Sequence, residues 1–225
     1  MIYNLHGNLG SASDWDGFPG EAVDLWAKSD LPYWEWALDF CADVKAKKEE
    51  SNFLVGYSLG GRLALHALIA EPELWDGAVI IGAHPGLCCV EDRTARRSSD
   101  AVWAGWARRL EWEAFLEKWN AQGVLRDGKP SENQFELVAR RKEIARGFEN
   151  WSLGAQDDLR ERLKNVTARV LWITGELDAK FSVLGTEMAE KMPNCELVVV
   201  EDSGHRVIFD QPKLLRDIIQ GFTTA

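Results

Sequence analysis

Six short apolar runs that do not alternate with polar residues constrain how this chain can fold. They lie at residues 2–5, 21–26, 52–57, 77–83, 168–174 and 195–200, each bounded by residues that favour turns. Strands that are buried on both faces of a parallel sheet have this composition. Helical patterns accompany several runs, at residues 61–70, 187–192 and 214–222. The chain is therefore predicted to form an α/β fold, with a mostly parallel sheet flanked by helices and right-handed crossovers.

One long segment, residues 91–165, interrupts this alternation. It contains no strand-like run, and its pattern predicts helices at about 91–108, 110–121, 131–149 and 156–164. We predict a helical cap inserted between two strands, with residues 1–90 and 166–225 forming the core. The cap holds 11 of the 15 arginines of the chain. Either most of them face water in ion pairs along the helices, or a few point into a cleft that receives an anion.

Charge and hydropathy restrict the partners of the protein. The 26 Lys and Arg residues against 36 Asp and Glu give a net charge of −10, which disfavours binding to nucleic acid or to an anionic membrane. No apolar run approaches the roughly 20 residues of a membrane span, and the first residues do not resemble a signal peptide. The four cysteines match no zinc-binding spacing. We expect reduced thiols in a cytoplasmic protein without a metal or a cofactor.

The stretch FLVGYSLGGRLALH, residues 53–66, places Ser58 between an apolar run and a helical pattern. Gly56 and Gly60 surround the serine in a Gly-x-Ser-x-Gly pattern, which lets neighbouring backbone pass at a sharp strand-to-helix turn. Such a turn holds the hydroxyl at the carboxyl edge of the sheet, where the following helix directs N–H groups at negative charge. Ser58 is therefore predicted to be catalytic, the alternative being an ordinary serine in a turn.

A catalytic serine needs a base, and the base needs an acid that orients it. Among the four histidines, His205 alone follows the serine late enough to leave room for an acid between them. His66 lies on the helix after the serine, where packing is its expected role. The acid should follow the run at 168–174, where Asp178 is favoured, with Glu176 as the fallback and Asp202 less favoured.

The stretch LHGNLG, residues 5–10, follows the first apolar run. A His-Gly pair at the end of a strand leaves backbone N–H groups free to face a site. The N–H groups of Asn8 and Leu59 are predicted to form an oxyanion hole with two donors, the alternative at His6-Gly7 being a simple turn. His84 also falls near the carboxyl edge of the sheet, and the sequence assigns it no role.

Seven stretches between residues 5 and 205 carry a family resemblance: LHGNLGSASDW, VGYSLGGRLALH, RRSSDAVWA, WEAFLEKW, WSLGAQDDL, GELDAKF and SGH. They resemble proteins of the α/β-hydrolase fold. Within that superfamily the chain resembles the family of 2-succinyl-6-hydroxy-2,4-cyclohexadiene-1-carboxylate synthases, which are lyases of menaquinone biosynthesis. Arg62, directly after the glycines that follow the serine, is the most specific match.

The resemblance implies a reaction without hydrolysis. In this family the serine of the triad acts as a base that removes a proton from a cyclohexene substrate, and pyruvate is eliminated. Since the substrate carries several carboxylates, the resemblance also implies contacts with arginines. The matching substrate-binding positions are Tyr57, Arg62, Arg96 (or Arg97 in a shifted register), Trp119 and Arg141.

The residues themselves also favour a substrate contact for Arg62. It lies four residues after Ser58, one helical turn along and on the same side of the helix. A guanidinium in that position suits a small anionic substrate, because it can hold a carboxylate through two hydrogen bonds. The alternative is a surface arginine paired with a glutamate of the cap.

The sequence also departs from the family pattern. Asn8 replaces a bulky apolar residue, His84 adds an imidazole, and residues 122–125 lack the usual proline and aromatic residue. The chain begins at what would be the third of eight strands, so the fold is expected to be shortened at the N-terminus. Three functions stay open: the lyase, a carboxylesterase or thioesterase with Ser58 as nucleophile, and a binding protein without turnover.

Overall fold

The computed structural model describes residues 1–126 and 128–224. In this part of the chain six strands form one sheet in the order β2-β1-β3-β4-β5-β6, and every pairing is parallel. The strands are β1 (Ile2–Leu5), β2 (Glu21–Val23), β3 (Phe53–Tyr57), β4 (Gly77–Ile81), β5 (Arg169–Gly175) and β6 (Cys195–Val200). All six predicted strands and the parallel α/β class are confirmed.

The second strand is shorter than the apolar run that predicted it. Its last residues form a short 3₁₀ helix, η2 (Leu25–Lys28), because the side chain of Asp24 accepts a hydrogen bond from the Trp26 N–H at 3.1 Å. A side-chain oxygen in that position caps the start of a helix and ends the extended chain.

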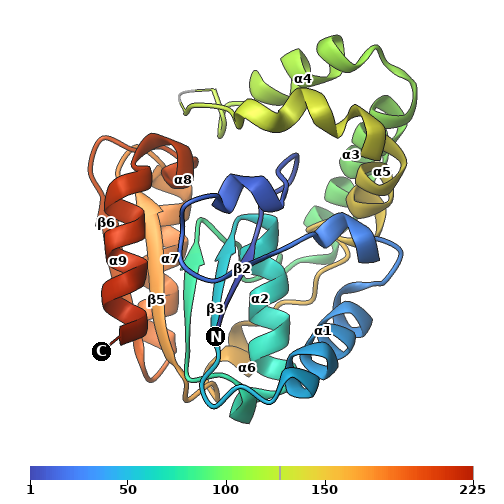
Figure 1. Cartoon of the computed structure of the whole chain (residues 1–225). Helices are drawn as coiled ribbons and strands as arrows, with labels where there is room; N and C mark the ends of the chain where they lie inside the picture. Colours follow the sequence, from blue (N-terminus) through green and yellow to red (C-terminus); the bar gives the residue numbers. More distant parts are fainter. Residues whose placement is uncertain (127, 225) are drawn as a thin grey trace.

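Helices cover both faces of the sheet (Figure 1). On one face lie α1 (Tyr33–Lys47), α2 (Leu59–Ala70) and α7 (Ala179–Lys191), and on the other lies α9 (Pro212–Thr224). Neighbouring residues of β5 point to opposite faces, so Trp172 packs in the apolar cluster beneath α1, α2 and α7, and Ile173 packs in the cluster beneath α9. The predicted helices at 61–70, 187–192 and 214–222 are confirmed as parts of α2, α7 and α9.

Helix α1 was not predicted from the sequence. Its buried residues include Trp36, Ala37, Phe40, Cys41 and Val44, which recur with the spacing of one helix face. Charged residues separate these apolar positions, so a search for continuous apolar runs passes over the segment.

The segment between β4 and β5 is helical and has no strand among its described residues. It forms α3 (Val90–Arg109), α4 (Trp112–Asn120), the 3₁₀ segment η4 (Glu132–Arg140), α5 (Arg141–Asn150) and α6 (Arg160–Leu163). In Figure 1, α4 lies above the sheet, and α3 and α5 lie at its upper right. The first two predicted cap helices are confirmed, and the third divides into η4 and α5.

The prediction of a helix over 156–164 is wrong except for its last turn. Residues 151–159 follow an irregular path, and Gly154 packs so closely that a Cβ atom there would lie 2.2 Å from the Arg93 carbonyl oxygen. The single turn α6 contacts α2 and α7. The division into cap and core stays a prediction, since one continuous apolar cluster includes Phe148 of α5 and Trp36 of α1.

No helix in residues 1–126 and 128–224 is long and apolar enough to cross a membrane.

Candidate active site

Ser58 occupies the turn between β3 and α2 in an unusual backbone conformation. Its φ of 52° and ψ of −105° lie in a region that residues with a Cβ atom rarely adopt. A Cβ atom on Gly56 would lie 2.6 Å from the Gly60 carbonyl oxygen, and one on Gly60 would lie 2.2 Å from the Leu5 carbonyl oxygen. Both glycines therefore permit the close approach that holds Ser58 in this turn.

Three side chains from separate loops form a chain of hydrogen bonds. The Oγ of Ser58 lies 3.1 Å from Nε2 of His205, and Nδ1 of His205 lies 2.7 Å from Oδ2 of Asp178. Because the Asp178 carboxylate accepts a hydrogen bond from Nδ1–H, the neutral ring presents a bare Nε2 to the serine hydroxyl. This arrangement can remove the Ser58 proton, which would activate the serine as a nucleophile or as a base.

The alternative acids lie away from the imidazole. Glu176 and Asp202 are exposed, and the Asp202 N–H donates to Glu176 Oε2 at 3.3 Å. Asp178 is buried at the start of α7, where its side chain also accepts a hydrogen bond from the Phe181 N–H. The structure thus brings Asp178, and neither alternative, to His205.

Of the two backbone N–H groups predicted as an oxyanion hole, one follows the serine in the chain and the other comes from the loop after β1. Leu59 begins α2 directly after Ser58, and Asn8 lines the same cavity as Ser58. Neither N–H has a hydrogen-bond partner among residues 1–126 and 128–224. Both are therefore available as donors to a negatively charged oxygen.

His6 holds the loop that presents Asn8. Its Nε2 accepts a hydrogen bond from the Leu25 N–H at 3.2 Å, which leaves Nδ1–H to donate to the Gly7 carbonyl oxygen at 2.9 Å. Burial lowers the pKa of His6 to about 4, so the ring is neutral at pH 7. His66 is also buried, stacked on Tyr33 with a centroid distance of 4.4 Å, and its role is packing, as predicted.

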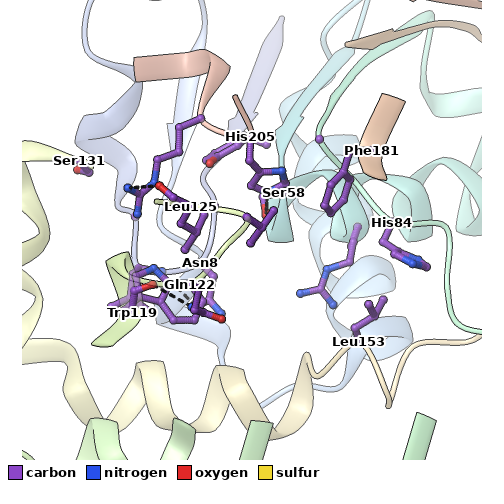
Figure 2. Close-up of a pocket in the computed structure, with 18 of the residues that line it drawn as sticks. Asn8, Ser58, His84, Trp119, Gln122, Leu125, Ser131, Leu153, Phe181 and His205 are labelled. Atoms are coloured by element: carbon purple, nitrogen blue, oxygen red, sulfur yellow. Dashed lines mark hydrogen bonds between the residues drawn. The ribbon is translucent and has the colours of Figure 1, made fainter. Parts of the chain in front are cut away.

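A cavity lies between the sheet edge and the helices inserted between β4 and β5 (Figure 2). Tyr57, Arg62, Arg96 and Trp119, which were predicted to bind substrate, all line it together with Ser58. The Trp119 ring packs against Trp103, with a centroid distance of 5.3 Å. The Tyr57 ring is buried against His205, with a centroid distance of 5.8 Å.

Arg62 is buried, although it lines the cavity. Its guanidinium donates hydrogen bonds to the Trp151 carbonyl oxygen at 3.0 Å and to the Tyr33 hydroxyl. In the described part of the chain it has no carboxylate partner within 4.0 Å, so the alternative of a surface arginine paired with a cap glutamate is wrong. Burial lowers the pKa of Arg62, which means that the charge lacks part of its solvation and would be stabilised by an anion.

Arg96 shares the cavity with Arg62. Its Nε–H lies 2.9 Å from each carboxylate oxygen of Asp100, and the Asp100 carboxylate also accepts a hydrogen bond from Ser152 Oγ at 2.7 Å. Arg97, the alternative in a shifted register, is exposed, does not line the cavity and donates to the Gly154 carbonyl oxygen at 2.9 Å. The geometry therefore supports Arg96 and not Arg97.

The prediction that Arg141 contacts substrate is wrong. Its guanidinium donates to the carbonyl oxygens of Ala107 and Leu110 at 2.8 and 2.5 Å, at the C-terminal end of α3. Carbonyls at the end of a helix lack intrahelical donors, and a cation satisfies them. Arg141 thus joins α5 to α3, and it does not line the cavity.

Sequence reasoning missed two basic residues of the cavity, Lys180 and Arg206. Lys180 comes two residues after Asp178, and Arg206 comes directly after His205, so proximity to the predicted triad was a signal for both. The Arg206 guanidinium donates to the carbonyl oxygens of Leu125 and Gly128 at 3.2 and 3.1 Å. Arg206 therefore connects the loop after β6 to the segment that follows α4.

The described residues contain no group of three His, Cys, Asp or Glu side chains placed to hold a metal ion.

Comparison with known proteins shows which family the chain belongs to. The model of the Alpha/beta hydrolase family matches residues 5–218. The chain belongs to the alpha/beta hydrolase family. A solved member of this fold, the structure of MenH from S. aureus, superposes with a TM-score of 0.84 at 21% identity and covers 98% of this chain and 92% of that chain.

Relatives of this chain carry the name 2-succinyl-6-hydroxy-2,4-cyclohexadiene-1-carboxylate synthase. The protein of Escherichia coli O1:K1 is 37% identical over 167 residues, which cover 72% of this chain and 64% of the relative, slightly less than two thirds of its length. The protein of Klebsiella pneumoniae is 30% identical over an alignment 227 positions long, which covers 92% of this chain and 87% of the relative.

The hydrogen-bond chain predicts the reactivity of Ser58 independently of any substrate. An alkyl fluorophosphonate should modify Ser58, and Asp178→Asn should slow the modification by about 10³-fold or more, because His205 loses the acceptor that orients it. The rate is measured by intact-protein mass spectrometry. Glu176→Gln is the matched control and should react as fast as the wild type. Equal rates for Asp178→Asn and the wild type would contradict the assignment of the acid.

Proposed function

We propose that this protein is a lyase of menaquinone biosynthesis that eliminates pyruvate from a cyclohexene intermediate carrying several carboxylates. The observation that carries the proposal is the buried Arg62, which has no carboxylate partner in the described chain and faces the cavity that Ser58 lines. The names of the relatives support it, since the compound they describe is a cyclohexadiene with a carboxylate and a succinyl group.

In the proposed reaction Ser58 acts as the base. His205 Nε2 takes the hydroxyl proton as the serine oxygen removes a proton from the ring, and Asp178 stabilises the resulting imidazolium. The electron pair of the broken C–H bond enters the ring as a double bond, and the carbon–oxygen bond to the departing pyruvyl group breaks. The proton on His205 is then available for the leaving group.

The remaining residues of the cavity bind the substrate and stabilise charge. The N–H groups of Asn8 and Leu59 would hold the oxygen on which negative charge develops. Arg62 and Arg96 would bind carboxylates, and Trp119 would cover the apolar part of the ring. The proposed chemistry needs no metal or cofactor, and the expected partner is a small anionic molecule in the cytoplasm, with no nucleic acid or membrane.

A second candidate is a carboxylesterase or thioesterase in which Ser58 attacks a carbonyl carbon. The two backbone N–H groups without partners favour it, because an oxyanion hole serves acyl transfer directly. A binding protein without turnover is less well supported, since the hydrogen bonds from Asp178 through His205 to Ser58 are complete.

Release of pyruvate from the pathway intermediate tests the proposal. The purified protein should release pyruvate, and Ser58→Ala should lower the rate by about 10³-fold or more, because the base is removed. Coupled oxidation of NADH by lactate dehydrogenase measures the product. Ser98→Ala, an exposed serine on α3, is the control and should leave the rate unchanged. Absence of pyruvate together with a trappable acyl group on Ser58 would identify an ester hydrolase instead.

The variant Arg62→Ala tests whether Arg62 binds the substrate or only supports the fold. We expect a loss of about 100-fold in kcat/KM for the polycarboxylate intermediate, because a buried ionic contact is lost. Hydrolysis of a small neutral ester such as p-nitrophenyl acetate should change little, and thermal melting checks the fold. Arg97→Ala, exposed on the same helix as Arg96, is the control. Equal losses on both substrates would mean that Arg62 is structural.

A further inference from the structure

One end of the cavity gathers positive charge around His84. Arg62 of α2, Arg96 of α3 and Lys180 of α7 all line the cavity together with this histidine. Burial, followed by the charges of Lys180, Arg62, Arg160 and Arg96, lowers the pKa of His84 to about 3. The three lining cations therefore act on the same small region, although they come from three different helices.

The hydrogen bonds of His84 fix which of its nitrogens carries the proton. The Gly86 N–H donates to Nδ1 at 3.1 Å, so the neutral ring carries its proton on Nε2. Gln156 Nε2 holds the backbone by donating to the His84 carbonyl oxygen at 2.9 Å. Nε2 of His84 has no partner within residues 1–126 and 128–224, and the residue is 7% exposed. His84 thus offers one fixed donor at the cavity wall.

Phe181 separates His84 from the triad. Its ring centroid lies 4.4 Å from that of His205 and 6.4 Å from that of His84, and Figure 2 shows it between the two imidazoles. Among the described residues, Ser58 is hydrogen-bonded to His205 and has no hydrogen bond to His84. His84 is therefore placed to bind a ligand and not to act as a second base.

The carboxylates at this end of the cavity already have hydrogen-bond partners within the protein. The Asp100 carboxylate bonds to Arg96 and Ser152, and the Asp178 carboxylate bonds to His205. Lys180 is exposed as a residue, lines the cavity and has no carboxylate within 4.0 Å in the described chain. Desolvation of its ammonium and then the charge of Arg96 lower its pKa, and the charge of Asp178 opposes them. The three cations exceed the carboxylates of Asp100 and Asp178 by one charge, and the neutral donor of His84 adds a hydrogen bond, so this end of the cavity favours an anionic ligand.

We propose that Lys180 and His84 form a subsite for a second carboxylate of the substrate, distinct from the carboxylate that Arg62 binds. The ligand class is a dicarboxylate arm, with one carboxylate at Arg62 and the other at Lys180 and His84. The identity of the whole substrate rests on the proposed function, whereas the subsite is testable by binding alone.

Succinate is the probe, because it carries two carboxylates joined by a short flexible chain. Lys180→Met should raise its Kd by at least about tenfold, since a charged hydrogen bond is lost, and Lys180→Arg should restore part of the affinity. Lys191→Met, at the exposed end of the same helix, is the matched control and should bind as the wild type does. His84→Leu should also weaken binding, and titration calorimetry measures every Kd.

Kinetics with the pathway intermediate give a second readout. Lys180→Met should raise KM by at least about tenfold and leave kcat within about threefold, because the subsite binds without touching the reacting atoms. An unchanged Kd and KM in Lys180→Met would overturn the subsite even if pyruvate is released. If Lys180→Met binds succinate more weakly and the wild-type protein releases no pyruvate, the subsite is upheld and the proposed function is rejected.

Discussion

The hydrogen bond between Asp178 and His205 is the interaction on which the site depends. It joins the loop after β5 to the loop after β6 at 2.7 Å, and through the imidazole it reaches Ser58 on the turn after β3. A parallel sheet brings these loops to one edge, because all its strands end there. The strained turn at Ser58 then sets the direction of the hydroxyl, and the close contacts of Gly56 and Gly60 maintain that turn.

The helices between β4 and β5 cover part of this edge and leave a partly open cavity with several cationic residues in its wall. Arg62 is buried beneath them through its bonds to Tyr33 and to the Trp151 carbonyl oxygen, so its position is fixed before a ligand arrives. A charge that is partly desolvated and lacks a carboxylate gains more from an anion than an exposed one would. The same enclosure makes a ligand with several carboxylates a better match than a neutral ester.

The features that follow from local chemistry were predictable from the sequence. The six strands follow from apolar runs, and the turn at Ser58 follows from its glycines, as does the order of Ser58, Asp178 and His205. Side-chain direction on the cap helices was not predictable, because Arg96 and Arg141 look alike in sequence. Arg141 donates hydrogen bonds to the carbonyl oxygens at the C-terminal end of α3. These oxygens are within its reach only because α5 packs against α3. Lys180 of α7 was passed over, although its position two residues after Asp178 was a signal in the sequence.

The central claim is that Ser58, activated by His205, takes a proton and does not form a covalent intermediate. Turnover of the pathway intermediate carrying deuterium at the abstracted position tests it, with intact-protein mass spectra recorded during the reaction. The account predicts a primary kinetic isotope effect on pyruvate release and an unchanged protein mass throughout. A mass increase located at Ser58, with no isotope effect, would contradict it.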